Sequence, residues 1–507
     1  MYREENKQRT GVKSMKQAQD TQENGGHKHN KRYYVHSAVT LFLMFAFGYV
    51  IPPFGGISSL GMRVLGVFLG LLYGWTFVEM LWPSLISFIA LGISGAMSVT
   101  EAFASGFGSN LTLILIFVFI FAAYMEASGL NSFVAHWFIS RKIAIGRPWI
   151  FTGLIIFCSF FLGAMTNLFA SMVICWSVFY RLAELLGYKP YDKYVLTVLF
   201  GILLGATLGS MAVPFQAVPV IALGLYESIM GTQVNFLQYT FFCAVMSSLL
   251  IICYLLLCKL IYRPDVSRLK SKEDRFADYR SEKLNKEERN ALAILGIFLL
   301  FVFLPGILPA QWLITTLLRN WGIVGSVSVC LTILMIIRRK DGQGLIDFTK
   351  LAQSGVNWEI VILIAATAPV CNALESPEAG VLDVVLNVLI PVMDRLNPFL
   401  LVAFVMICLL IMTQFAHNAV LCIVFVPMLV PLATQYQVNP MIMVVAILFA
   451  THVAFSTPAA SSQAAMLFGN SAWVTKKEVF KLAVLFILWV MIFYVVILIP
   501  CLFQFFA

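Results

Sequence analysis

The sequence predicts an all-α polytopic membrane protein, from its composition, its alternating hydropathy and the placement of its charges. Of its 507 residues, 60% are hydrophobic and only 12% are charged. A soluble domain carries about 25% charged residues, because water must wet its surface whatever its size. The missing polar surface is explained if lipid is the solvent. The formal net charge of +9 then reflects membrane topology, and we expect no nucleic-acid partner.

Alternating hydropathy predicts about 11 transmembrane helices, since a span needs about 20 apolar residues. Two further apolar stretches, about 148–186 and 398–433, each carry a polar break at the middle. We predict that both are re-entrant hairpins, because broken backbone at that depth must be buried in protein or line a cavity. The predicted spans are 37–52, 59–75, 77–97, 110–130, 194–225, 240–262, 291–309, 313–337, 357–375, 440–470 and 482–504.

Charge placement predicts the topology. With the N-terminus inside, all but three of the 34 Lys and Arg residues face the cytoplasm, in keeping with the positive-inside rule. We therefore expect a multi-pass protein of the plasma or inner membrane with a cytoplasmic N-terminus. The predicted units are a disordered basic cytoplasmic tail at 1–35, a first transmembrane helix at 36–58, a first repeat at 59–262, a charged cytoplasmic linker at 263–290 and a second repeat at 291–507.

Matched elements recur in the two halves, in the same order and about 250 residues apart. The leading span of the first copy runs outside to inside and that of the second runs inside to outside, so the repeats are inverted. Inverted repeats with interrupted helices are typical of secondary transporters that hold substrate near the midplane. The matched elements are the spans ending at Glu126 and Glu375, the hairpin breaks 165–167 and 416–418, and the small, polar, proline-bearing stretches 205–214 and 451–458.

The breaks indicate where ligands bind. A broken helix has unpaired N–H groups at one start, which with the helix dipole favour an anion. The unpaired C=O groups at the other end suit a cation such as sodium. The predicted substrate-binding residues are Thr166, Asn167, His417, Asn418, Thr457 and Pro458. The predicted cation-binding residues are Thr166, Asn167, Gly205, Gly209, Ser210, Asn418, Thr451 and Ser456.

His417 is an ionisable residue inside the membrane, which by default indicates function. It would donate to an anion or couple to protons; the alternative is a neutral histidine bonded to a backbone carbonyl. Neither hairpin break has a nearby Arg or Lys, so we expect dipoles, amides and a co-bound cation to hold the anion. We expect no catalytic residue, no metal beyond possible sodium and no cofactor other than a sodium ion or proton as the coupling ion.

At several motifs the chain resembles the divalent anion:sodium symporters, which carry citrate, succinate, other dicarboxylates and sulfate. The resemblance runs from about residue 55 to the end. The family has Ser-Asn-Thr at each hairpin tip; this chain has Thr166-Asn167-Leu168 and His417-Asn418-Ala419, so both asparagines are present. The resemblance implies a homodimer in which one domain moves against a scaffold. The motifs that carry it are Leu65–Phe68, Met97–Phe103, Gly106–Gly108 and Ser456–Pro458.

The leading hypothesis is cation-coupled symport of a small organic anion, of the di- or tricarboxylate type. The alternatives are an exporter or ion exchanger of the wider ion-transporter superfamily, or a carrier of inorganic anions such as sulfate. No acidic pair lies in the middle of a span, which argues against a cation exchanger. The sequence has no metal-ligand cluster or catalytic motif, which argues against an enzyme. A receptor or structural subunit would leave the broken helices without a purpose.

Overall fold

A computed structural model describes residues 31–270, 283–338, 342, 344–381, 384, 397–458 and 460–506. Within these ranges the regular structure is helical, apart from one isolated bridge between Arg338 and Gly344. Ten of the described helices are long and apolar enough to cross a membrane, or eleven if one bent pair counts as a single span. The predicted all-α polytopic fold is confirmed.

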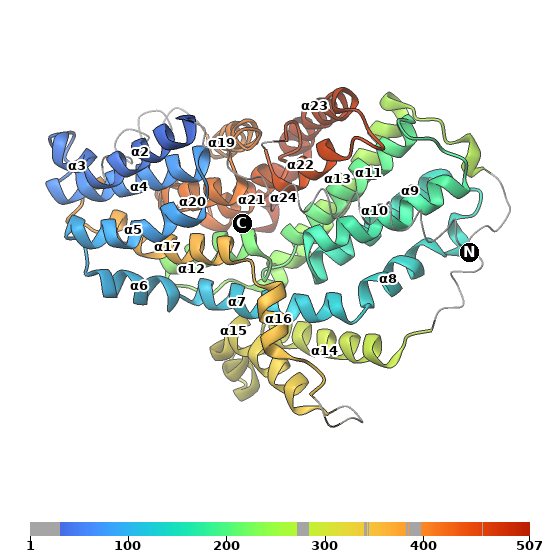
Figure 1. Ribbon diagram of the computed structural model, residues 1–507, viewed down its shortest axis with the longest axis horizontal. Helices are drawn as coiled ribbons and strands as arrows, with labels where there is room; N and C mark the ends of the chain where they lie inside the picture. Colours follow the sequence, from blue (N-terminus) through green and yellow to red (C-terminus); the bar gives the residue numbers. More distant parts are fainter. Residues whose placement is uncertain are drawn as a thin grey trace.

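The first half of the chain supplies twelve of the labelled helices (Figure 1). They are α2 (Lys31–Phe45), α3 (Phe47–Val50), α4 (Ser59–Phe77), α5 (Leu81–Ser94), α6 (Val99–Phe107), α7 (Asn110–Ala127), α8 (Leu130–Ile139), α9 (Pro148–Met165), α10 (Leu168–Leu185), α11 (Lys193–Met211), α12 (Ala217–Met230) and α13 (Phe236–Leu257).

The second half supplies ten more (Figure 1). They are α14 (Lys286–Phe303), α15 (Leu313–Ile336), α16 (Phe348–Gly355), α17 (Trp358–Glu375), α19 (Pro398–Met412), α20 (Asn418–Gln435), α21 (Pro440–His452), α22 (Ser462–Gly469), α23 (Lys476–Phe493) and α24 (Ile499–Phe505). Short 3-10 or π-helical turns lie at Lys142–Ala144, Cys258–Tyr262, Ser267–Leu269, Leu304–Gly306 and Tyr494–Leu498.

The predicted tail and linker lie partly outside the described residues, namely 1–30 and 271–282. The predicted disorder of 1–35 is wrong at its end, because α2 already begins at Lys31. Tyr33, Tyr34 and Val35 continue the apolar run toward the N-terminus and allow the helix to start earlier than the prediction placed it.

Polar side chains cap many of the helices and fix where they begin. Ser98 accepts from the backbone N–H of Glu101, and the Glu101 carboxylate accepts from the N–H of Ser98, which forms a capping box at the start of α6. Asn285 and Glu288 make the same arrangement at the start of α14. Such caps satisfy N–H groups that the first helical turn leaves unpaired.

Close packing of α9 on α11 forms the centre of the first half. Every residue of α11 from Tyr194 to Met211 is buried. A Cβ atom at Gly205 would collide with the carbonyl oxygen of Ile156, and one at Gly209 with the carbonyl oxygen of Phe160. Small residues at a spacing of four allow helix backbones to approach this closely in a membrane.

The helix break in this half begins later than predicted. Helix α11 continues through Gly205, Gly209 and Ser210, and the chain leaves it only between Ala212 and Gln216. The glycines serve the contact with α9, whereas Pro214 lacks the N–H that a continuing helix would need. The predicted stretch 205–214 therefore contains the break only in its last residues, and Gly205, Gly209 and Ser210 have helical backbone.

A short helix of each half packs against a long helix of the other half (Figure 1). Helix α6 packs on α17, and α16 packs on α7. In each contact a glycine meets the partner helix: Gly106 lies against the carbonyl of Ala365, and Gly355 lies against Ala123. Helices α16 and α17 meet at an angle of 79°. Because Gly106 and Gly355 stand about 250 residues apart, this reciprocal packing supports the predicted inverted relation.

Candidate functional site: two hairpin tips and the helix breaks behind them

The first hairpin turns at Thr166 and Asn167, as predicted. Helix α9 ends at Met165 and α10 begins at Leu168, and the two helices pack along each other. The Asn167 side-chain oxygen accepts from the N–H groups of Phe169 at 2.8 Å and Ala170 at 3.4 Å. The Thr166 hydroxyl donates to the carbonyl of Leu162 at 2.8 Å. Asn167 therefore caps a helix whose start points toward the tip.

A glutamine that the sequence analysis missed holds this tip. Gln216 is the last residue before α12, and its side-chain Nε2 donates to the carbonyl of Thr166 at 2.9 Å and to that of Ala164 at 3.3 Å. These carbonyls are the ones that the end of α9 leaves available. The amide thus links the helix break of the first half to its hairpin.

The second hairpin turns over five residues, Thr413 to His417, between α19 and α20. Both helices pack against α21. His417 caps α20, and its Nδ1 accepts from the N–H of Ala419 at 3.3 Å. Asn418 is the first helical residue, and its side-chain oxygen also meets that N–H, at 3.0 Å. His417 and Asn167 both cap the helix that follows their tip, so these two residues correspond. The repeat predicted from the sequence instead pairs Asn418 with Asn167.

Gln414 ties the second tip to the helix break behind it. Its Nε2 donates to the carbonyls of Val453 at 2.6 Å and Leu410 at 2.9 Å. Its Oε1 accepts from the N–H groups of Phe455 at 3.2 Å and Ser456 at 3.0 Å. Only 6% of Gln414 is exposed. Both donors and both acceptor positions of this buried amide are therefore satisfied.

The break that Gln414 contacts begins at Val453, directly after α21, and precedes α22. The Thr457 hydroxyl donates to the carbonyl of Gln414 at 2.9 Å, and the Thr413 hydroxyl donates to that of Thr451 at 2.9 Å. Thr451 itself is the penultimate residue of α21, and its hydroxyl donates to Ile447 at 2.8 Å. Pro458 is exposed.

The predicted site residues therefore fall into three groups. Thr166 and Asn167 lie at the first tip. At the second tip lie His417 and Asn418, and at the helix break behind it lie Thr451, Ser456, Thr457 and Pro458. Gly205, Gly209 and Ser210 lie in the continuous part of α11, where the Ser210 hydroxyl donates to the carbonyl of Thr207.

Helix α12 connects the two regions. It packs side by side with α20, and the Thr434 hydroxyl near the end of α20 lies 3.9 Å from the sulfur of Met230 at the end of α12. Two adjacent helices that end together run parallel, so their starts face the same side. The start of α12 follows Gln216 at the first tip, and the start of α20 follows His417 at the second tip.

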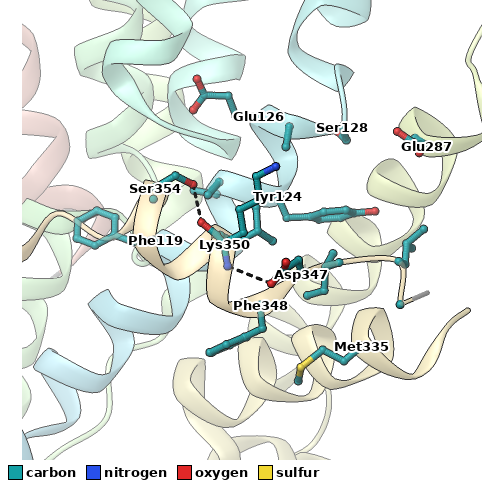
Figure 2. A pocket seen from close by; sticks show the side chains of 18 of the residues that line it. Phe119, Tyr124, Glu126, Ser128, Glu287, Met335, Asp347, Phe348, Lys350 and Ser354 are labelled. Atoms are coloured by element: carbon teal, nitrogen blue, oxygen red, sulfur yellow. Dashed lines mark hydrogen bonds between the residues drawn. The ribbon is translucent and has the colours of Figure 1, made fainter. Parts of the chain in front are cut away.

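A cavity of about 1080 Å³ reaches Asn167 from one side of the molecule. The ends of α7 and α15, the start of α14 and helix α16 enclose it, and Figure 2 shows Lys350 on α16 between Asp347 and the wall that carries Glu126 and Ser128. Among the described residues, the ionisable lining consists of Tyr124, Glu126, Glu287, Arg338, Asp347 and Lys350. The predicted topology places this opening in the cytoplasm.

A resident metal centre has no support in the described part of the chain, where no group of three His, Cys, Asp or Glu side chains could hold an ion. The ten cysteines are all free and are buried or half-buried. The polar groups that the tips present are therefore main-chain carbonyls and N–H groups, neutral amides, hydroxyls and one imidazole.

Comparisons with known proteins concern the family and the fold. The family described as "Citrate transporter" (CitMHS) matches residues 68–391. No curated protein sequence matches the chain. Among solved structures, the YdaH transporter of Alcanivorax borkumensis, whose topology is described as unusual, has a TM-score of 0.52. The match covers 79% of this chain and 86% of that chain at 14% identity, so it concerns the fold alone.

Proposed function

We propose that this chain, which belongs to the citrate transporter family, carries small di- and tricarboxylates into the cell in symport with a cation. Family membership makes it a secondary transporter of anions in a membrane and not an enzyme, and the predicted relationship to carboxylate transporters is confirmed at that level. The substrate class, the coupling ion and the direction belong to the proposal, as do the homodimer, the cell-membrane location and the cytoplasmic N-terminus.

The observation that carries the proposal is the pair of capped helix starts at the two tips. Helices α10 and α20 each begin where a hairpin turns, capped by Asn167 and His417. A helix start concentrates N–H groups and the positive end of the dipole, which favours carboxylates. Neither tip contains Arg or Lys, so neutral groups and a co-transported cation would balance the charge of the anion.

The cavity supplies a route to the first tip. It is wide enough for a citrate-sized anion and is lined by Asn167 as well as by Lys350 and Arg338. A path of this kind, from solvent to a helix start near the midplane, is what one half of an alternating-access cycle requires.

The test is uptake of labelled citrate, succinate and sulfate into proteoliposomes, with sodium and proton gradients imposed separately. We expect citrate or succinate to accumulate under one of the two gradients. Uptake of sulfate alone would favour the inorganic-anion alternative. Absence of uptake for all three anions under both gradients would refute the proposed substrate class.

A pair of cap variants makes the test specific to the site. Asn167→Ala removes the cap of α10, and Asn235→Ala removes an equivalent cap from α13, where Asn235 accepts from the N–H of Gln238. Both changes remove a capping side chain, which accepts from two N–H groups at Asn167 and from one at Asn235. We expect a raised KM for the anion only in Asn167→Ala; an equal effect in Asn235→Ala would mean that the loss is one of helix stability.

A further inference from the structure

Two glutamine side chains donate hydrogen bonds to main-chain carbonyls at the helix breaks. Gln216 donates to the carbonyls of Ala164 and Thr166 at the end of α9. Gln414 donates to the carbonyl of Val453, which follows the end of α21, and to that of Leu410. Carbonyls at the ends of interrupted helices are the groups that coordinate coupling cations in transporters with broken helices. In this chain, each half has an amide at that position.

An amide NH2 group is a good substitute for a cation in such a place. It has two donors and directs them at two oxygens. It carries no full charge, so its burial does not require a counter-ion, whereas leaving the buried carbonyls unpaired would be unfavourable. The amide also needs an acceptor partner for its oxygen, and Gln414 finds it in the N–H groups of Phe455 and Ser456.

The side-chain oxygen of Gln414 therefore occupies the N–H groups that could bind an anion at the second break. The N–H groups of Phe455 and Ser456 are the kind that an interrupted helix presents to a carboxylate. Since Gln414 already accepts from both, its single side chain pairs the donors and the acceptors that the break leaves open. The first half differs: among the described residues, the hydrogen bonds of the Gln216 side chain go to carbonyls, while the start of α10 faces the cavity through Asn167.

We propose that Gln216 and Gln414 are positioning residues whose amides take, one in each half, the carbonyl positions that a coupling metal ion would otherwise occupy. The hairpin tips then stay joined to their helix breaks without a bound ion. The consequence for transport rests on the proposed function: sodium has no part in assembling the site, and the second tip is preformed while the first remains open to the anion.

The first experiment needs no substrate. The full chain in detergent is heated in sodium chloride and in choline chloride, as the wild type and as Gln216→Ala, Gln414→Ala and Gln463→Ala. Gln463 is a matched control, because it is only 5% exposed on α22 and, within the described residues, no hydrogen bond joins its amide to either tip. Both salts supply chloride, but only sodium is small enough to fit between two carbonyls.

For the wild type, and likewise for Gln463→Ala, we expect the unfolding temperature to be the same in sodium chloride as in choline chloride. Gln216→Ala and Gln414→Ala should unfold earlier in choline and recover part of the loss in sodium, because a ligand that binds only the folded state stabilises it. An equal sodium response in all four proteins, or no sodium response in the two tip variants, would overturn the proposal.

The second experiment separates positioning from general damage. In Gln216→Glu the side chain keeps its shape but cannot donate when ionised, so the carboxylate and the two carbonyls repel one another unless a cation lies between them. We expect its anion KM to rise about tenfold in choline and to return toward the wild-type value in sodium, with little change in maximal rate. An unchanged KM, or a fall in maximal rate alone, would contradict the role. If the wild type carries no carboxylate, the proposed function fails, while the unfolding measurement still decides the role of the amides.

Discussion

The two halves join hairpin tip to helix break with the same chemical group placed on opposite partners. In the first half Gln216 extends from the break into the hairpin, and in the second Gln414 extends from the hairpin into the break. The positions are not equivalent by the offset of about 250 residues that relates the halves. The halves share a hydrogen bond from a glutamine side chain across the gap, but the two glutamines are not at matching positions. A search for matched residues could therefore not find them.

The halves also differ in how open they are. Next to α6, the rings of Phe88, Phe103 and Phe107 stack, with Phe88 4.3 Å from Phe103 and 5.9 Å from Phe107. Next to α16, the corresponding short helix of the second half, lies the cavity. An inverted pair of this kind has two arrangements, with one side packed and the other open.

The largest effect should come from the difference between the two glutamines. Gln414→Ala removes four hydrogen bonds from a buried position, whereas Gln216→Ala removes two from a half-buried one. Leaving each buried polar partner unpaired costs about 1–3 kcal/mol. We expect Gln414→Ala to lower the free energy of unfolding by about 3–5 kcal/mol and Gln216→Ala by about half as much. Chemical unfolding in mixed micelles measures both, and an equal loss would remove the contrast between the tips.

The next effect concerns packing, where the halves differ in their use of glycine. Gly209→Ala would drive a methyl group into the carbonyl of Phe160, while nothing lies within 4 Å of a Cβ at Gly296 on α14. Overpacking costs about 1–3 kcal/mol, whereas Gly→Ala in an open helix gains up to about 1 kcal/mol from propensity. Unfolding midpoints should therefore shift in opposite directions. A tolerated Gly209→Ala would mean that α9 and α11 can separate.

Replacing the cap residue His417 should change stability less, and it should change how uptake depends on pH. Protonation of Nδ1 would take from His417 the lone pair that accepts from Ala419, whereas Asn167 caps at any pH. We expect His417→Asn to keep stability and flatten the pH dependence of uptake, and His417→Ala to cost about 1 kcal/mol. Uptake measured from acidic to neutral pH provides the test; an unaltered profile in His417→Asn would exclude a proton role for this residue.

The first hairpin and the capping positions were predictable because they follow from local chemistry. A polar residue followed by an apolar run predicts a helix start, which is why the breaks at Thr166 and His417 lie where the sequence placed them. The predicted break at 205–214 starts too early because glycine has two uses. It interrupts helices and also allows them to pack closely, and only the position of Ile156 and Phe160 on α9 distinguishes these uses.

The tip glutamines and the short helices were missed for different reasons. An amide inside an apolar stretch was a signal that the sequence offered for Gln414, but its partners lie about 40 residues away and no local rule connects them. Helix α6 had a visible capping box at Ser98 and Glu101, and α16 had Asp347 as a cap. Both helices fall short of a membrane span, so a search for spans passed over them.

The smallest expected effect is electrostatic and concerns the open side. Lys350 and Glu126 both line the cavity, with Lys350 on α16 and Glu126 on α7, and both are exposed in it. A charge at the mouth of a cavity changes the local concentration of an anion, and salt screens it over about 10 Å at 0.1 M ionic strength. Replacing Lys350 with Gln should therefore weaken anion binding from that side, and replacing Glu126 with Gln should strengthen it.

These two changes are a matched pair, because each removes one unit of charge and the signs are opposite. We expect KM values measured from the cavity side to move about two- to fivefold in opposite directions at low salt and to converge at high salt, with maximal rates unchanged. Measurement from the other side should show no difference, since Lys350 and Glu126 both line the cavity. Effects of the same sign, or effects that persist at high salt, would mean that Lys350 and Glu126 act through the packing of α16 on α7. The opening of the cavity would then depend on the contact between α16 and α7, and the charges of Lys350 and Glu126 would not act on the anion directly.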